Sequence, residues 1–161
     1  RGQDAIKVLK QLVESYGGRR SKELGDIHHR IASAHLADGD MAEALAQLES
    51  ARKMDPGSIV VLTQLGQLSI RLADASEDAG GDDAGENKAE HLKRANGVFR
   101  ALLLQRLDDQ SPITKAEVFY WLAQVNTRED DKKKAIHNLE RAIANDKTLE
   151  KARTMLDELK G

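Results

Sequence analysis

The chain has 161 residues, of which 40% are hydrophobic, 32% charged and only 3% aromatic. This balance favours a folded, helix-rich protein over a disordered chain or a sheet, because sheets prefer aromatic and β-branched residues. Its 25 Lys and Arg residues are matched by 27 Asp and Glu residues, which argues against nucleic acid as the main partner. There is no cysteine, so disulfides and thiolate metal sites are excluded, and no stretch approaches the roughly 18 consecutive apolar residues of a membrane span.

The spacing of apolar residues predicts helices along almost the whole chain. In chain order they cover residues 3–16, 21–38, 41–54, 58–74, 88–106, 114–127, 131–145 and 148–160. Asp40 with Glu43, and Thr114 with Glu117, have the spacing of capping boxes at the starts of two of these helices. The first residues contain neither an initiator Met nor an apolar signal region, so we expect the chain to be part of a longer protein.

An acidic segment, residues 74–90, separates the fourth and fifth predicted helices. It holds seven Asp and Glu residues against one Lys, with glycines at positions 80, 81 and 85. Since such a segment has little to bury, we expect a mobile loop that projects from one edge of the fold. Its order of oxygen ligands does not reproduce an EF-hand, which leaves recognition of a basic partner as the functional alternative.

Two patterns of residues recur along the chain. Within the first helix of each predicted pair, a four-residue pattern reads His28-Ile31-Ala32-His35, Leu62-Leu65-Gly66-Ser69 and Phe119-Leu122-Ala123-Asn126. In the following helix, a second pattern reads Ala44-Leu48-Ala51, Ala95-Phe99-Leu102 and Ala135-Leu139-Ala142, and it also appears alone as Ala5-Leu9-Leu12. Small residues allow paired helices to approach closely, so we expect Ala32 to oppose Ala44 and Ala123 to oppose Ala135.

These registered patterns resemble the tetratricopeptide repeat (TPR), in which W-x2-L-G-x2-Y is followed by A-x3-F and then by P. The best match covers residues 25–58, where Gly39 and Asp40 make the inner turn and Pro56 follows the second helix. The chain departs from the pattern at its Trp-like and Tyr-like positions, and its middle repeat is interrupted. The resemblance implies an all-α, right-handed superhelical solenoid of antiparallel helix pairs; the alternative is an irregular helical bundle with chance periodicity.

The resemblance also divides the chain into repeats. The expected divisions are the second helix of a preceding repeat (1–20), TPR 1 (21–58), TPR 2 with an acidic flexible insert at about 74–90 (59–115), TPR 3 (116–147) and a C-terminal capping helix (148–161). The last helix is expected to cover the apolar face of the third repeat, as end helices of solenoids commonly do.

In TPR arrays the first helix of each repeat lines a concave groove that meets the ligand. Carried onto this sequence, the groove residues are His29, Ser33, Thr63, Gln67, Arg71, Tyr120, Gln124 and Arg128. Family members that clamp a C-terminal carboxylate use Lys at the His29 position and Asn at the Ser33 position, so that ligand is not supported. Arg71 and Arg128 could each pair with one carboxylate, and the neutral residues suit an extended or helical peptide. The alternative is that all eight are ordinary exposed residues of a spacer.

Other candidate sites have simpler structural explanations. His28 and His35 share a helical face, but they occupy packing positions without a carboxylate ligand or an HExxH spacing, so we expect packing rather than metal binding. No nucleophile motif or phosphate loop is present, and we predict no catalytic residue, cofactor or metal. Trp121 is expected at the junction with the preceding repeat or partly exposed.

The predicted function is that of a protein-interaction scaffold that binds a peptide or partner surface in the concave groove. One alternative is a structural spacer or a module that self-associates through the exposed N-terminal half repeat. Another is a substrate-recruiting region of a multidomain enzyme. We expect a protein or peptide partner rather than nucleic acid or membrane, and we favour a cytoplasmic location. The 116–160 stretch is similar in style to bacterial TPR proteins.

Overall fold

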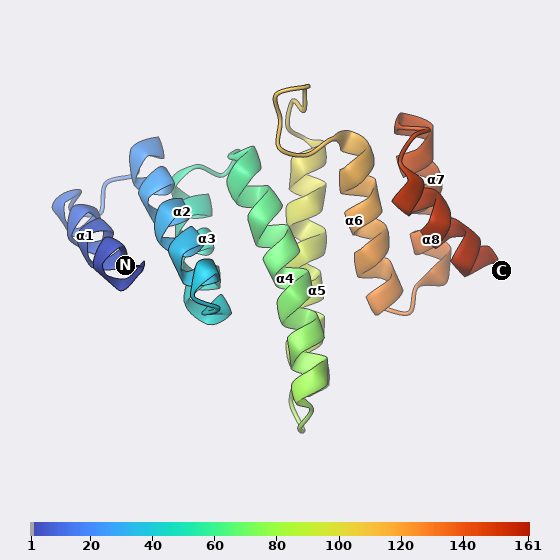
Figure 1. Ribbon diagram of the computed structural model, residues 1–161, viewed down its shortest axis with the longest axis horizontal. Coiled ribbons are helices and arrows are strands. Elements are labelled where there is room, and N and C mark those ends of the chain that lie inside the picture. Colours follow the sequence, from blue (N-terminus) through green and yellow to red (C-terminus); the bar gives the residue numbers. More distant parts are fainter. Residues whose placement is uncertain (1) are drawn as a thin grey trace.

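The computed structural model describes residues 2–161, and within them the chain forms eight helices and no strand (Figure 1). The helices are α1 (Gly2–Ser15), α2 (Lys22–Ala37), α3 (Met41–Met54), α4 (Ile59–Ala79), α5 (Ala84–Leu103), α6 (Lys115–Arg128), α7 (Lys132–Asn145) and α8 (Glu150–Lys160). The predicted all-α class is confirmed.

The helices pack mainly against their neighbours in the chain. The closest partners are α2 with α3, α4 with α5, and α6 with α7, and these antiparallel pairs are joined by α3–α4 and α5–α6 contacts. At the two ends, α1 packs on α2 and α8 packs on α7. Figure 1 shows the pairs following one another along the long axis, with the chain termini at opposite ends. The predicted solenoid of sequential helix pairs is therefore confirmed.

Side-chain caps fix where several helices begin. At α6 the capping box is complete: Thr114 Oγ1 accepts from the Glu117 amide at 3.2 Å, and the Thr114 amide donates to Glu117 Oε2 at 2.9 Å. At α3 only half of the predicted box forms, with Asp40 Oδ1 accepting from the Glu43 amide at 3.2 Å. The Asp40 amide donates instead to the carbonyl of His35 at 2.9 Å, so it is not available to the Glu43 side chain.

Small residues occupy the places where paired helices meet. Ala32, Ala44, Ala123 and Ala135 are all completely buried, in agreement with the expected close approach of α2 to α3 and of α6 to α7. In the middle pair the small residue lies under an aromatic ring, because a Cβ added at Gly66 would be 2.6 Å from Cζ of Phe99. The glycine therefore makes room for the largest side chain in the core of α5.

The acidic segment 74–90 is helical, and the prediction of a loop there is wrong. Helix α4 continues to Ala79 and α5 starts at Ala84, which leaves only a four-residue turn. Gly80 and Gly81 make this turn with φ angles of 65° and 94°, a region that favours glycine. Each extended helix packs on the other, so the acidic residues are carried on paired helices that project well beyond the rest of the array (Figure 1).

Helix α1 forms a small core of its own with α2. Ile6 on α1 is buried together with Ile27 and Ile31 on α2. On another side of α1, Val8 is 63% exposed and Leu12 is 44% exposed. The helix thus has one covered and one uncovered apolar side.

Candidate functional site

The eight candidate groove residues lie on α2, α4 and α6, the first helices of the three central pairs. We call the surface that they define the first-helix face; its residues are His29, Ser33, Thr63, Gln67, Arg71, Tyr120, Gln124 and Arg128. His29 Nε2 lies 3.0 Å from Gln64 Oε1, which links α2 to α4. Arg128 binds Asp74, which links α6 to α4. The three helices are therefore joined in order by side chains of this face.

On α2, the polar atoms of the face are already paired within the chain. Besides the contact between His29 and Gln64, the Ser33 hydroxyl donates to the carbonyl of His29 at 3.0 Å. The serine therefore bonds to the backbone of its own helix rather than to the imidazole, and the pair has none of the geometry of a nucleophile and its base.

On α4, the exposed side chains flank a buried threonine. Thr63 is only 7% exposed, and its hydroxyl donates to the Ile59 carbonyl at 2.7 Å, so it offers little to a ligand. Gln67 is half-buried and Arg71 is exposed. Within residues 2–161 no carboxylate lies within 4.0 Å of the Arg71 guanidinium. Val60, one of the most exposed large apolar residues, is 41% exposed on the same helix.

On α6, the arginine is held by a two-point ion pair. Arg128 Nε lies 2.7 Å from Asp74 Oδ1, and Nη2 lies 3.0 Å from Oδ2. Its remaining nitrogen, Nη1, donates to the carbonyl and to Oε1 of Gln124 at 3.0 and 2.8 Å. Every nitrogen of this guanidinium is engaged, in contrast to Arg71.

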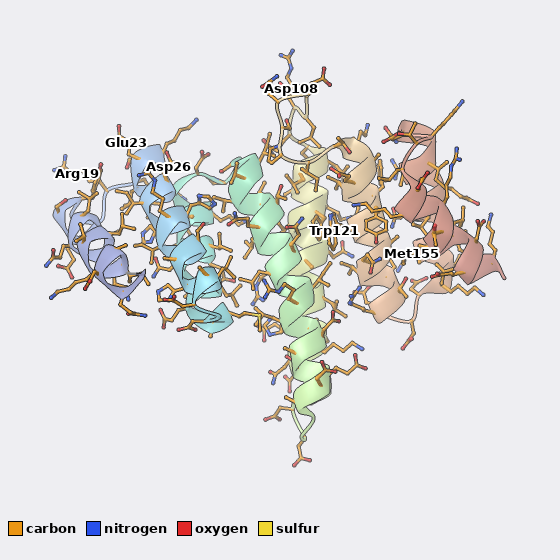
Figure 2. All side chains as sticks on the ribbon, viewed as in Figure 1. Arg19, Glu23, Asp26, Asp108, Trp121 and Met155 are labelled. Carbon is orange, nitrogen blue, oxygen red and sulfur yellow. The ribbon has the colours of Figure 1, made fainter. Side chains whose placement is uncertain are left out.

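Side chains of the C-terminal helix, α8, contact Tyr120 and Gln124 of α6. Gln124 Nε2 donates to the Tyr120 hydroxyl at 2.9 Å and to Met155 Sδ at 3.2 Å. Met155 lies on α8 and is labelled in Figure 2. Lys151 Nζ, also on α8, lies 4.6 Å from the centre of the Tyr120 ring, within the range of a cation–π contact. Tyr120 and Gln124 are thus partly covered by the chain itself.

Trp121 lies at the junction between two helix pairs, as expected. Its ring stacks on Phe99 of α5 with a centroid distance of 6.1 Å and an interplanar angle of 5°. It meets Tyr120 edge-on at 5.7 Å. The tryptophan therefore fixes α6 against the preceding pair and supports the neighbouring tyrosine.

The two histidines that share a face have packing roles. His35 is 5% exposed, and His28 Nδ1 lies 2.8 Å from Gln47 Oε1. No hydrogen-bond partner is described for either ring nitrogen of His35, although Nδ1 is 3.9 Å from Asp40 Oδ2. Across residues 2–161, no group of three or more His, Cys, Asp or Glu side chains has an arrangement that could hold a metal ion.

Sequence reasoning did not find four residues that contact this face: Gln64, Asp74, Lys151 and Met155. Asp74 was assigned to the acidic insert, and only the continuation of α4 beyond it brings its carboxylate to Arg128. Gln64 lies one residue beyond a predicted groove position, and the α8 residues became neighbours only through packing. The periodicity of α4 was the one signal that could have placed Gln64 beside α2.

The helix pairs and their registered small residues define an α-helical repeat protein. Two sequence models, each described as a tetratricopeptide repeat, match residues 25–68 and 116–149. The chain contains repeats of the tetratricopeptide family, which are generally protein–protein interaction modules. These matches identify no catalytic family. A search of curated proteins found no match. None of the helices in residues 2–161 has the length and apolar character needed to cross a membrane.

Proposed function

We propose that this protein is a non-catalytic interaction scaffold that holds a peptide or partner surface on the α2–α4 part of the first-helix face. The observation that carries the proposal is the difference between the two arginines of the face. Arg128 is held by Asp74 and Gln124, whereas Arg71 is exposed and no carboxylate of the described chain approaches it. An exposed guanidinium and an exposed apolar residue on the same side of α4 suit a partner that carries both an acidic and an apolar group.

The spacing on α4 defines the partner more closely. Val60 and Arg71 are about three helical turns apart, which places them on one side of α4 at a separation of about 16 Å. An extended peptide covers this length in about five residues at about 3.3 Å each. We therefore expect an acidic side chain about five positions from an apolar one, with Gln67 available to bond the peptide backbone between them.

The α6 part of the face contributes in a different way. Tyr120, Gln124 and Arg128 are held by contacts within the chain, so they form a rigid border beside α4. Arg128 would bind a carboxylate of the partner only by leaving Asp74. This division predicts that substitutions on α4 weaken binding more than substitutions on α6.

A selection from a random peptide library tests this proposal. Wild type is compared with Arg71→Glu and with the control Lys93→Glu, which makes the same charge change at an exposed position on α5. We expect wild type and the control to enrich peptides in which Asp or Glu lies about five positions from an apolar residue. Arg71→Glu should not retain these peptides. Enrichment without an acidic position, or equal retention by Arg71→Glu, would contradict the proposal.

A second candidate function, self-association, rests on α1. Val8 and Leu12 lie one turn apart and are 63% and 44% exposed, so two copies of this helix could cover each other's apolar side. Light scattering across a wide concentration range tests this candidate. A mass that rises with concentration in wild type and stays monomeric in Val8→Lys would support it, and a monomeric wild type throughout would contradict it.

A further inference from the structure

A polar cavity of about 170 Å³ lies between α5, α6 and α7. Phe119, Leu122 and Asn126 line it from α6. Since successive helical residues are 100° apart, these three point to the opposite side of α6 from Tyr120, Gln124 and Arg128. The cavity is therefore separate from the first-helix face.

Two asparagines form the inner wall of the cavity. Asn126 is only 3% exposed, and its Oδ1 accepts a hydrogen bond from Asn138 Nδ2 at 2.7 Å. Asn126 Nδ2 points to Glu129 Oε2 at 3.4 Å, which is a long hydrogen bond. The corresponding positions of the preceding pair hold Ser69 and Val98, so the second pair lacks these two amides.

Three cations surround the same space: Arg100 from α5, and Lys134 and Arg141 from α7. Lys134 pairs with Asp131 at 2.8 Å. In the part of the chain that the structure describes, no carboxylate lies within 4.0 Å of the Arg100 or Arg141 guanidinium. Arg141 is positioned over the Phe119 ring, with Cζ 4.3 Å from the ring centre. The cavity thus has two guanidinium groups without a counter-charge.

At the preceding junction, between the α2–α3 and α4–α5 pairs, the corresponding positions hold an ion pair with a purely structural role. Glu49 follows Ala44 by five residues, and Arg94 directly precedes Ala95; the two form an ion pair of 2.9 Å between α3 and α5. The same two positions at the next junction hold Arg100 and Lys134.

A pair of opposite charges is therefore replaced by a pair of like charges at the cavity. The hydrogen bond to Asp131 raises the pKa of Lys134, so this cation already has an anionic partner. Arg100 and Arg141 line the same cavity without such a partner, and both would favour an anion there.

We propose that this cavity binds a phosphate group, with Arg100 and Arg141 as its main ligands and Lys134 and Asn138 as further donors. The cavity volume is several times the share of liquid that one water molecule takes up, about 30 Å³, so the cavity has room for a phosphate group. The guanidinium fork matches phosphate oxygens, and the three oxygens of a phosphate monoester accept donors from both α5 and α7. A carboxylate has only two oxygens and would satisfy one guanidinium.

The test is a titration of the protein with inorganic phosphate at low ionic strength, followed by ¹H–¹⁵N NMR. We expect saturable shifts of the Asn126 and Asn138 side-chain amides. Arg100→Gln and Arg141→Gln should each weaken binding by about tenfold or more, as expected for the loss of a charged hydrogen bond. Arg30→Gln, which removes an exposed arginine on α2, should bind like wild type. Shifts that rise linearly without saturation, or that are equal in wild type and both cavity variants, overturn the proposal.

Arg100→Glu provides an internal check, because it recreates the charge pair of Glu49 and Arg94. It should abolish the phosphate-induced shifts while raising the melting temperature without phosphate, whereas unchanged phosphate binding in this variant overturns the assignment of Arg100.

Two further titrations identify the source of the phosphate. A phosphoserine peptide that binds at least tenfold more tightly than both inorganic phosphate and its unphosphorylated form indicates a modified protein, and equal affinity for the peptide and for inorganic phosphate indicates the free ion. Acetate that binds as tightly as phosphate overturns the choice of phosphate.

Discussion

Arg128 and Asp74 are 54 positions apart in the sequence, yet they form a two-point ion pair that joins α6 to the extended part of α4. The pair exists because α4 continues past the residue at which the composition becomes acidic. The ion pair gives Asp74, a residue of the acidic segment, a structural role. It also occupies Arg128, which the repeat pattern had placed in the groove, so that Arg128 is not free to bind a ligand.

Asp74→Asn should lower the free energy of unfolding by up to about 1 kcal/mol. Both side chains are partly exposed, which limits the gain from the pair, but its two-point geometry places it at the stronger end of surface ion pairs. Urea unfolding measures the change. Asp78→Asn, at an exposed position of the same helix with no ion pair described, should leave the midpoint almost unchanged. In a double-mutant cycle with Arg128→Gln, a coupling energy of zero would show that the pair adds nothing to stability.

Gly66→Ala should destabilise the protein by about 1–3 kcal/mol, because its new Cβ would overlap the Phe99 ring. The same substitution at Gly97, an exposed helical position with no atom within 4 Å of the added Cβ, should stabilise by up to about 1 kcal/mol through helix propensity. Thermal melts of the two variants should therefore move in opposite directions. If Gly66→Ala melts at or above wild type, the close approach of α4 and α5 is wrong.

Thr114→Ala removes the Oγ1 acceptor of the capping box at α6, although the backbone amide of residue 114 can still donate to Glu117, and it should lower stability by about 1 kcal/mol. The matched substitution Thr154→Ala lies at an exposed position inside α8, where it should be neutral or slightly stabilising. Chemical unfolding of both variants measures the difference. Equal midpoints for the two would mean that the box does not stabilise α6.

Stability should fall in acid partly through Asp131. Hydrogen bonds from the side chain and the backbone amide of Lys134 lower the pKa of this carboxyl below its ordinary value of 3.8. A group with a lowered pKa in the folded state contributes stability above its unfolded pKa and loses it as the pH falls through the folded value. Asp131→Asn keeps a capping oxygen but cannot titrate. The stability difference between wild type and this variant should therefore be constant from about pH 7 to about pH 5 and shrink below about pH 4. A difference that does not change with pH would contradict this role for Asp131.

Much of the fold follows from local sequence signals. The predicted range 41–54 agrees with α3 as observed, and the repeated small residues lie at the helix contacts where they were expected. These features depend on caps and helical periodicity, which act over a few residues. The acidic segment was misread because its charge and glycines were weighed without its alanines and glutamates, which are good helix formers once two long helices can support each other.

The site was less accessible to prediction. The repeat pattern gave the helices that carry the first-helix face, but it could not distinguish Arg71 from Arg128, since the difference depends on a carboxylate from another helix. The phosphate cavity could have been noticed from the sequence by comparing junctions, because Glu49 and Arg94 align with Arg100 and Lys134. That comparison requires the second helices of the pairs to be aligned on Ala44, Ala95 and Ala135, and then their charged residues to be compared instead of their apolar ones.

The chain-neighbour packing described for the fold also governs how this molecule can come apart. Helices α1 and α8 each have a close neighbour on one side only, whereas α4 and α5, the two longest helices, are supported by each other and by pairs on both sides. Opening should therefore start at the two ends and reach the centre last. Slow amide exchange is to be expected in α4 and α5. Arg71 and Arg100 are carried by this central unit, and both would keep their positions while the terminal helices open and close.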